Sequence, residues 1–188
     1  MKKLIIFLLC ITLSPFTAFA IALSSITNNP AQYKKVHKDE NWSTYIDKDS
    51  IKPIRHAPPF YTIQGTIYDV SNDNKLIRES ILVVDYNYAY SINSFIRKDN
   101  IWDSTFSLYD TKEQTINKLT TKFDQKIMKN TGMIASETYA KMWTSNEKKA
   151  TPLSAEHDFL IKFATSKYYV ANYLFYHCYH EPFQTTKF

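Results

Sequence analysis

Residues 60–90 read FYTIQGTIYDVSNDNKLIRESILVVDYNYAY, and this stretch decides the fold. Apolar and polar side chains alternate from Phe60 to Val70 and again from Ile77 to Tyr90, which is the period of a half-buried strand. Between the two runs, residues 71–74 are Ser-Asn-Asp-Asn, a composition that favours a turn. Two alternating runs joined by a polar turn predict an antiparallel β-hairpin.

Strand signals continue on both sides of this hairpin. Residues 42–47 predict a short strand that ends in a turn at Lys48 and Asp49. Residues 92–97 and 101–109 flank the polar residues 98–100 and predict a second hairpin. From Tyr33 to about Tyr109, the chain therefore reads as an antiparallel meander.

Residues 111–143 carry two conflicting signals. Leu119, Phe123 and Ile127 recur at helical spacing, but β-branched threonines lose side-chain freedom in a helix. The residues Asn130-Thr131-Gly132 add a further turn signal. We favour more antiparallel strand in this segment.

The C-terminal part predicts one long helix. Thr151 and Pro152 suit a helix start, and apolar residues then recur every three or four positions as far as Cys178. Pro182 ends this helix, which spans about residues 153–179. The expected fold class is α+β, an antiparallel β-sheet meander with a long C-terminal helix packed on one face.

The N-terminus has the three parts of a secretory signal. Lys2 and Lys3 precede the apolar run 4–13, and Ala18-Phe19-Ala20 offers the small residues that a signal peptidase reads. We expect residues 1–20 to be cleaved, 21–32 to form a flexible leader and 33–188 to form a single domain. The alternative is an uncleaved anchor, since residues 4–23 form a longer apolar stretch if Ser14, Pro15 and Thr17 are tolerated. The expected localisation is outside the cytoplasm, in the periplasm, at the cell surface or in the medium, without a stable membrane anchor after cleavage.

Composition excludes several classes of function. Gly65 and Gly132 are the only glycines, whereas phosphate-cradling loops, dinucleotide folds and nucleophile elbows need more. We therefore expect no cofactor. Loss of Lys2 and Lys3 lowers a formal net charge of only +5, so nucleic acid is not an expected partner. Cys178 is then the only cysteine, and the aromatic residues that remain after the signal is removed, 14 tyrosines among them, must supply much of the core.

Two groups of residues are candidates for a metal-binding or catalytic site. His177, Cys178, His180 and Glu181 are potential metal ligands, but on a helix Cys178 points about 100° away from His177, and the order matches no zinc-enzyme motif. The acids that recur near predicted turns suit capping roles, although two of them could meet in a glycosidase-like pair; they are Asp47, Asp49, Asp103 and Asp110. We assign no catalytic or metal-binding residue.

Tyrosine is the most unusual feature of the composition. Three tyrosines follow one strand face in residues 85–90, and more decorate the predicted C-terminal helix. Aromatic rings with polar tips suit partner recognition, although a share of them must be core. The candidate interaction surface consists of Tyr86, Tyr88, Tyr90, Tyr169, Tyr173 and Tyr176.

Short motifs give the chain a family resemblance. Trp42, the triplet Tyr45-Ile46-Asp47 and the pair Ser50-Ile51 precede the long hairpin, and residues 171–176 with Pro182-Phe183 form an aromatic C-terminus. In these residues the chain resembles the surface-adhesin E family of bacterial envelope proteins and related uncharacterised exported proteins. The resemblance implies a small α+β envelope domain, in some members a binder of host matrix or serum proteins, and it brings no catalytic residues.

Three hypotheses for function follow. The first is a non-enzymatic, adhesin-like binding domain of the cell envelope, whose partner is another envelope protein or a host protein, with an exposed aromatic patch. The second is a periplasmic or secreted enzyme with a cleft in which two acids meet at perturbed pKa values. The third is an inhibitor or chaperone-like partner that works through a long, uncovered edge strand.

Overall fold

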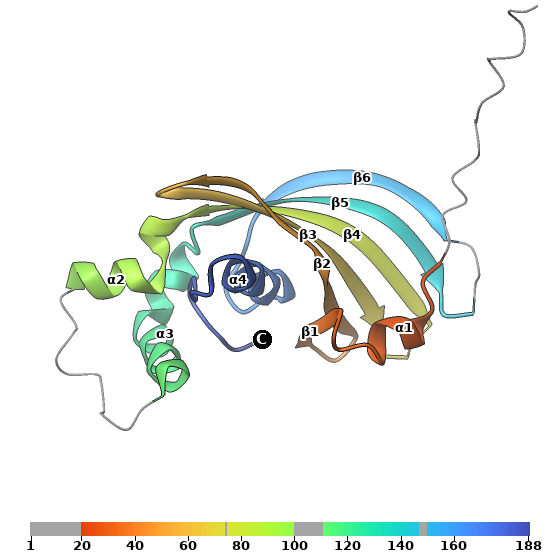
Figure 1. Cartoon of the computed structure of the whole chain (residues 1–188), viewed down its shortest axis with the longest axis horizontal. Coiled ribbons are helices and arrows are strands. Elements are labelled where there is room, and N and C mark those ends of the chain that lie inside the picture. The colour runs from red at the N-terminus through yellow and green to blue at the C-terminus, as the bar shows by residue number, and fades with distance from the viewer. Residues whose placement is uncertain (1–19, 74, 100–110, 147–149) are drawn as a thin grey trace, which may run out of the picture.

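The computed structural model describes residues 20–73, 75–99, 111–146 and 150–188, and these form one curved six-stranded sheet wrapped around a helix (Figure 1). The strands follow chain order across the sheet, and every neighbouring pair is antiparallel. This confirms the predicted meander and the α+β class. The strands are β1 Tyr33–Lys38, β2 Trp42–Ala57, β3 Phe60–Ser71, β4 Leu76–Asn87, β5 Met133–Thr144 and β6 Thr151–Leu160.

Helices occupy the hollow of the sheet and its ends. The C-terminal helix α4, Ser166–Tyr179, lies on the concave side of the sheet, as predicted for the last helix (Figure 1). The 3₁₀ helix η1, Tyr88–Tyr90, leads from β4 to α2, Ile92–Asp99, and α3, Lys112–Lys129, follows beside α2 at one end of the sheet. The short helix α1, Leu23–Thr27, precedes β1 at the other end.

The predicted central hairpin is present as β3 and β4. Tyr61, Ile63 and Ile67 are buried on the concave face, and the register places Gly65 opposite Leu82. Gly65 lies where α4 comes closest, because a Cβ atom there would be 2.7 Å from Cδ2 of Leu174. The alternation of β3 thus supplies a floor of apolar side chains, with one gap that admits the helix.

The core beneath the sheet is rich in aromatic rings. Phe175 of α4 packs against Tyr86 and Phe183 with ring centroids 5.2 and 5.1 Å apart, and all three side chains are buried. The Tyr86 hydroxyl donates a hydrogen bond of 2.8 Å to the backbone carbonyl of Ala171. Large aromatic residues therefore provide much of the buried area.

β2 differs from its prediction, because it is one strand of 16 residues rather than a short strand followed by a turn. The expected turn at Lys48 and Asp49 is a bulge, where the register with β3 shifts between Asp47 and Lys52. The Ser50 hydroxyl bridges the bulge, since it donates to the Asp47 carbonyl and accepts from the Thr66 N–H, both at 2.7 Å. A polar bulge and a polar turn have the same sequence signature.

The predicted second hairpin is wrong in its first half. Residues 92–97 belong to helix α2, and residues 101–109 lie outside the described part of the chain. Ile92, Phe95 and Ile96 are buried together at helical spacing, and the Ser91 hydroxyl accepts a hydrogen bond from the Ser94 N–H in the first turn. The helical period therefore decides the conformation of these eight residues.

The strand predicted over residues 111–143 is correct only for β5. Helix α3 begins with a capping box, in which Thr111 and Gln114 each bond the other's backbone N–H. Leu119, Phe123 and Ile127 are buried along one face. The cap and the apolar stripe together outweigh the low helix propensity of the threonines, and the predicted turn at Gly132 (φ 66°) then leads into β5.

The helix predicted over residues 153–179 is two elements. Residues 151–160 form strand β6, which pairs with β5, and α4 begins only at Ser166. The helix cap is Thr165, whose side chain accepts a hydrogen bond from the Tyr168 N–H, and not Thr151. Tertiary pairing with β5 overrides the apparent apolar stripe that joined the two segments.

The segment 21–32 is anchored rather than flexible, which corrects the predicted leader. Ile26 of α1 is buried in a second apolar cluster with Tyr68, Val70 and Trp143, on the face of the sheet opposite the main core. The Trp143 indole N–H donates to the Ile21 carbonyl at 3.0 Å. Apart from Ala20, the predicted signal peptide lies outside the described residues, and no helix within them is long and apolar enough to span a membrane.

Candidate interaction surface

The three tyrosines of the β4 end do not share an exposed strand face. Tyr86 is 1% exposed, and its side chain belongs to the core. Tyr88 and Tyr90 lie in η1 and are half-buried. The Tyr88 hydroxyl donates a 3.2 Å hydrogen bond to a carboxylate oxygen of Glu181, which ties η1 to the C-terminal segment.

The three tyrosines of the C-terminal helix also separate. Tyr169 stacks on His37 of β1 with ring centroids 5.0 Å apart, and Tyr173 is buried against Phe188. Tyr176 is the one with a large exposed fraction, 38%, and its ring lies 5.6 Å from that of Phe188. These contacts order the helix against the sheet and the C-terminal segment.

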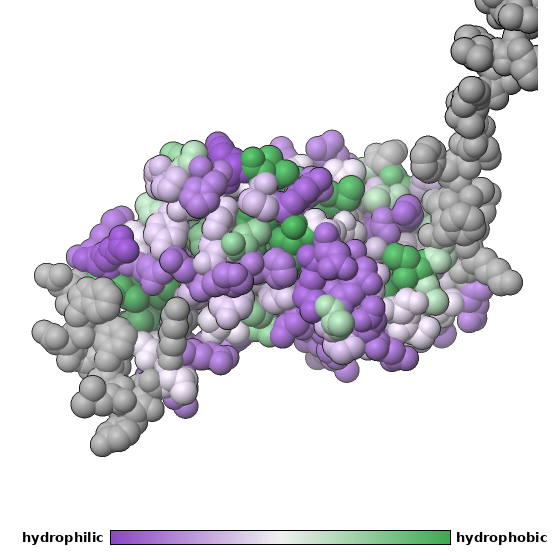
Figure 2. Space-filling model, viewed as in Figure 1, coloured by the Kyte–Doolittle hydropathy of each residue, from purple (hydrophilic) through white to green (hydrophobic). Residues whose placement is uncertain are grey.

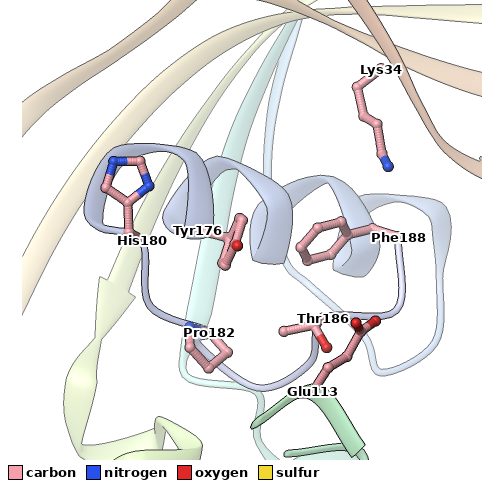
Figure 3. Close-up of a pocket in the computed structure, with 7 residues that line it drawn as sticks. All are labelled: Lys34, Glu113, Tyr176, His180, Pro182, Thr186 and Phe188. Carbon is pink, nitrogen blue, oxygen red and sulfur yellow. The ribbon is translucent and has the colours of Figure 1, made fainter. Parts of the chain in front are cut away.

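Tyr176 lines a cavity of about 360 Å³ between α4 and the C-terminal segment (Figure 3). The Lys34 ammonium lies 5.9 Å from the centre of the Phe188 ring at one side of this cavity, and Glu113 approaches from α3. The two opposite charges face an aromatic wall. Tyr86 and Tyr90 line a second cavity together, and Tyr169 and Tyr88 line one further cavity each, so the six predicted tyrosines form no single surface.

The larger of those cavities, about 660 Å³, is an aromatic cleft at the β2–β3 hairpin. His56, Tyr61 and Tyr179 pack edge to face there, with ring centroids 5.1 to 5.2 Å apart. Burial raises the pKa of the Tyr61 and Tyr179 hydroxyls. Both tyrosines therefore stay neutral at physiological pH, and the cleft is a packing feature with polar edges.

The outer, convex face of the sheet carries a group of three exposed apolar side chains. Phe60, Ile134 and Leu160 are 47%, 55% and 50% exposed, and all three line one pocket of about 300 Å³. They come from β3, β5 and β6, far apart in the sequence. Hydrophobic residues reach the surface at several places along the outer side of the sheet, among hydrophilic ones (Figure 2). We call these three residues and their pocket the outer pocket.

Register explains how the outer pocket is assembled. One row of paired residues crosses five strands on the outer face: Arg55, Thr62, Asp85, Ile134 and Leu160. Asp85 accepts hydrogen bonds from Thr62 at 2.5 Å and from Arg55 at 3.5 Å. The row thus has a polar, hydrogen-bonded end on β2 to β4 and an apolar end on β5 and β6.

The pocket could not be predicted from the sequence, because two of its strands resemble other elements there. Leu160 continues the apolar stripe of the predicted C-terminal helix, and Ile134 lies in the ambiguous segment 111–143. An apolar residue at a position that alternates with buried ones, such as Ile134 between Met133 and Ala135, is the available signal. It becomes readable only after the register is known.

The concave face carries a buried ionic cluster of Asp69, Arg78, Glu137 and Lys167 at the start of α4. The Lys167 ammonium lies 2.6 Å from a Glu137 oxygen and 3.5 Å from an Asp69 oxygen. Arg78 bonds the same Asp69 oxygen at 2.8 Å, and its guanidinium lies over the Tyr139 ring. The cluster fastens the first turn of α4 to three strands.

Electrostatics keep the buried Asp69 carboxylate ionised. Burial by itself would raise its pKa, but the charge of Lys167 and the hydrogen bonds from Arg78 and Thr44 outweigh burial and lower the pKa. Two acids do meet here, yet each is paired with a cation. This is the geometry of a structural ion network rather than of a general acid and base.

The other candidate residues have local roles or are dispersed. Asp47 accepts hydrogen bonds from the Asp49 N–H and the Gln32 amide at the β2 bulge, and Asp103 and Asp110 lie outside the described residues.

In the C-terminal group of potential metal ligands, His180 ends α4 in a left-handed conformation, and burial raises the pKa of the Cys178 thiol. Within the described ranges, no three His, Cys, Asp or Glu side chains approach closely enough to hold a metal ion.

Comparison with known proteins gives no relative. No protein-family model, no curated protein and no solved structure matches the chain.

Proposed function

We propose that the protein is an exported, non-enzymatic domain of the cell envelope that binds another protein through the outer face of its sheet. The observation that carries this proposal is the outer pocket, where three large apolar side chains, each about half exposed, converge from three strands. Exposed apolar groups rimmed by polar residues mark interaction sites. Arg55 and Asp85 provide that polar rim.

Export is supported by the sequence of the leader. A charged start, a short apolar run and Ala18-Phe19-Ala20 fit a cleaved signal. Cleavage after Ala20 would keep Ile21, whose carbonyl accepts the Trp143 hydrogen bond. Cleavage at the predicted site would therefore leave this hydrogen bond of the domain intact.

The family resemblance supports an adhesin-like partner, either an envelope protein or a host protein. It rests on Trp42, Tyr45-Ile46-Asp47 and Ser50-Ile51, which all lie in β2. Trp42 lies against the Arg78 guanidinium and Ile46 is fully buried, so these motif residues support the fold. The motif therefore supports a shared architecture, and the proposed binding face lies outside the motif residues.

The enzyme hypothesis gains less from the geometry. Asp69 and Glu137 are the acids that meet on the concave face, but Lys167 lies between them and α4 closes over them. Asp69, which its cations keep ionised, cannot act as the protonated member that acid catalysis needs.

A capture experiment with matched variants tests the proposal. The exported protein, purified and immobilised, is incubated with envelope and host-matrix fractions, and the retained proteins are identified. We expect a retained partner whose amount falls at least tenfold for Ile134→Ser/Leu160→Ser. Met128→Ser is the control, because Met128 is equally exposed but lies on α3. Equal retention by both variants, or no specific retention, would refute the proposal.

A further inference from the structure

The two edges of the sheet are built differently. β1 has six residues, carries Lys34, Lys35 and Lys38, and shifts its register at Val36. Short length, lysines and a bulge are the devices that protect an edge from further pairing. β6 has ten residues, and no strand pairs with its edge opposite β5 within the part of the chain that the structure describes. The third hypothesis from the sequence required such an edge.

Backbone geometry shows which groups β6 offers. The Ile161 N–H donates to the Met133 carbonyl at 3.0 Å, and the register continues without a shift as far as Ala155. In an antiparallel pair, alternate residues direct their N–H and C=O groups to the same side. The backbone groups of Glu156, Asp158 and Leu160 therefore point away from β5, towards the open edge.

The side chains of the same three residues determine what this edge attracts. Glu156 and Asp158 are exposed on the outer face, opposite the uncharged Thr138 and Ser136 of β5. Neither carboxylate forms an ion pair within the described ranges, and Ser136 donates to Glu156 at 3.3 Å. Leu160 continues this line into the outer pocket. The edge thus presents two acids followed by an apolar position.

We propose that β6 accepts an extended segment of a partner protein as a seventh strand, with basic residues beside Glu156 and Asp158 and an apolar residue in the outer pocket beside Leu160. Main-chain hydrogen bonds supply affinity in this mode, and alternate side chains supply specificity. The proposal rests on the proposed protein-binding function and names the chemistry of its partner.

A second copy of the chain fits the edge poorly. Antiparallel pairing of two β6 strands about His157 places Glu156 opposite Asp158 of the other copy, and pairing about Asp158 places that residue opposite itself. Like charges directly opposite each other are destabilising. β1 of a second copy has the right charge, but its bulge at Val36 interrupts the ladder that it would have to extend.

Synthetic peptides test the proposal directly. The probe is a peptide of about nine residues that alternates lysine and valine, and its control replaces each lysine by glutamate. Titration into the isotope-labelled exported protein, followed by amide NMR, should move the signals of residues 156–160 first. We expect at least tenfold weaker binding of the glutamate peptide and a severalfold loss between low and high salt. Binding of both peptides alike would overturn the proposal.

Two variants at one position separate the backbone from the charge. Asp158→Asn keeps the outward N–H and removes the charge, so binding of the lysine peptide should weaken severalfold. Asp158→Pro also removes the outward N–H but no hydrogen bond to β5, and it should abolish binding while the β5 amide signals stay in place. Equal binding by the two variants would exclude strand addition.

The outcomes keep the two proposals apart. If the lysine peptide does not bind but partner capture still depends on Ile134 and Leu160, strand addition is wrong and the protein-binding function stands. If the peptide adds to β6 while capture does not depend on Ile134 and Leu160, strand addition stands and the outer pocket is not the capture site.

Discussion

The two faces of this sheet use the same strands for different purposes. On the concave face, Ile63 and Ile67 pack under α4, and Asp69 joins the ionic cluster farther along β3. On the outer face, Phe60 and Thr62 of the same strand meet the surface. Because successive side chains point to opposite faces, substitutions one residue apart should act on different properties. Stability should depend on the concave face and on the buried cluster around Tyr68 and Trp143, and recognition on the end of the outer face that carries the outer pocket.

The largest effect should come from the contact that seats α4 in the sheet. Leu174→Ala removes a fully buried side chain that fills the space above Gly65, and we expect a loss of about 3–4 kcal/mol in unfolding free energy. Urea denaturation measures it. Tyr176→Ala, on the exposed side of the same helix, should cost much less. Equal costs would show that α4 is not anchored through its concave-facing side.

The ionic cluster should give the next largest effect. Asp69→Asn leaves Lys167 and Arg78 with one carboxylate fewer in a buried site, and we expect a loss of about 2 kcal/mol at neutral pH. Urea denaturation at pH 7 measures this loss.

The same variant should change how stability depends on pH. Asp69 has a lowered pKa in the folded protein, so its contribution is complete above the unfolded pKa of about 4 and disappears as the pH falls through the folded value. Stability of the wild-type protein should therefore fall more steeply than that of Asp69→Asn in acid below about pH 4. Denaturation curves at several acid pH values compare the two slopes, and parallel slopes would contradict the assignment.

The smallest effect on stability should come from the outer face. Ile134→Ser changes a side chain that is more than half exposed, and we expect a change within about 0.5 kcal/mol. The neighbouring Ala135→Ser, which points into the core, is the matched comparison and should cost more, because it buries a hydroxyl there. Thermal unfolding followed by circular dichroism distinguishes them. A large loss for Ile134→Ser would mean that the outer pocket also carries stability.

Sequence patterns gave the correct answer where local and tertiary forces agree. The β3–β4 hairpin has a long alternating pattern and a polar turn, and the structure pairs it from Phe60 with Asn87 to Val70 with Ile77. They failed where a short segment fits both a helix and a strand. Residues 92–97 form a helix and not the predicted strand, because Phe95 packs against Phe123. Residues 151–160 form a strand and not the start of the predicted helix, because they pair with β5.

The candidate surface shows the same division. Tyrosines are conspicuous in the sequence, but Tyr86 and Tyr173 are buried, and the other four candidates line four different cavities. Phe60, Ile134 and Leu160 were inconspicuous one at a time, since an isolated exposed apolar residue is ordinary. Their meaning comes from convergence, which the register of three strands creates.

By itself the sequence determined the meander and the presence of a terminal helix, because the alternation of residues is a local property of the chain, and its signal-like leader stays a prediction. Only the tertiary structure decided which residues share a face, since the outer pocket combines segments that are distant in sequence and pairing with β5 decides which side of β6 is a free edge. Hydrogen-bonded register between strands is a long-range choice. Because of this register, Leu160 is not a helix residue as predicted but the exposed end of a row of paired residues that crosses five strands.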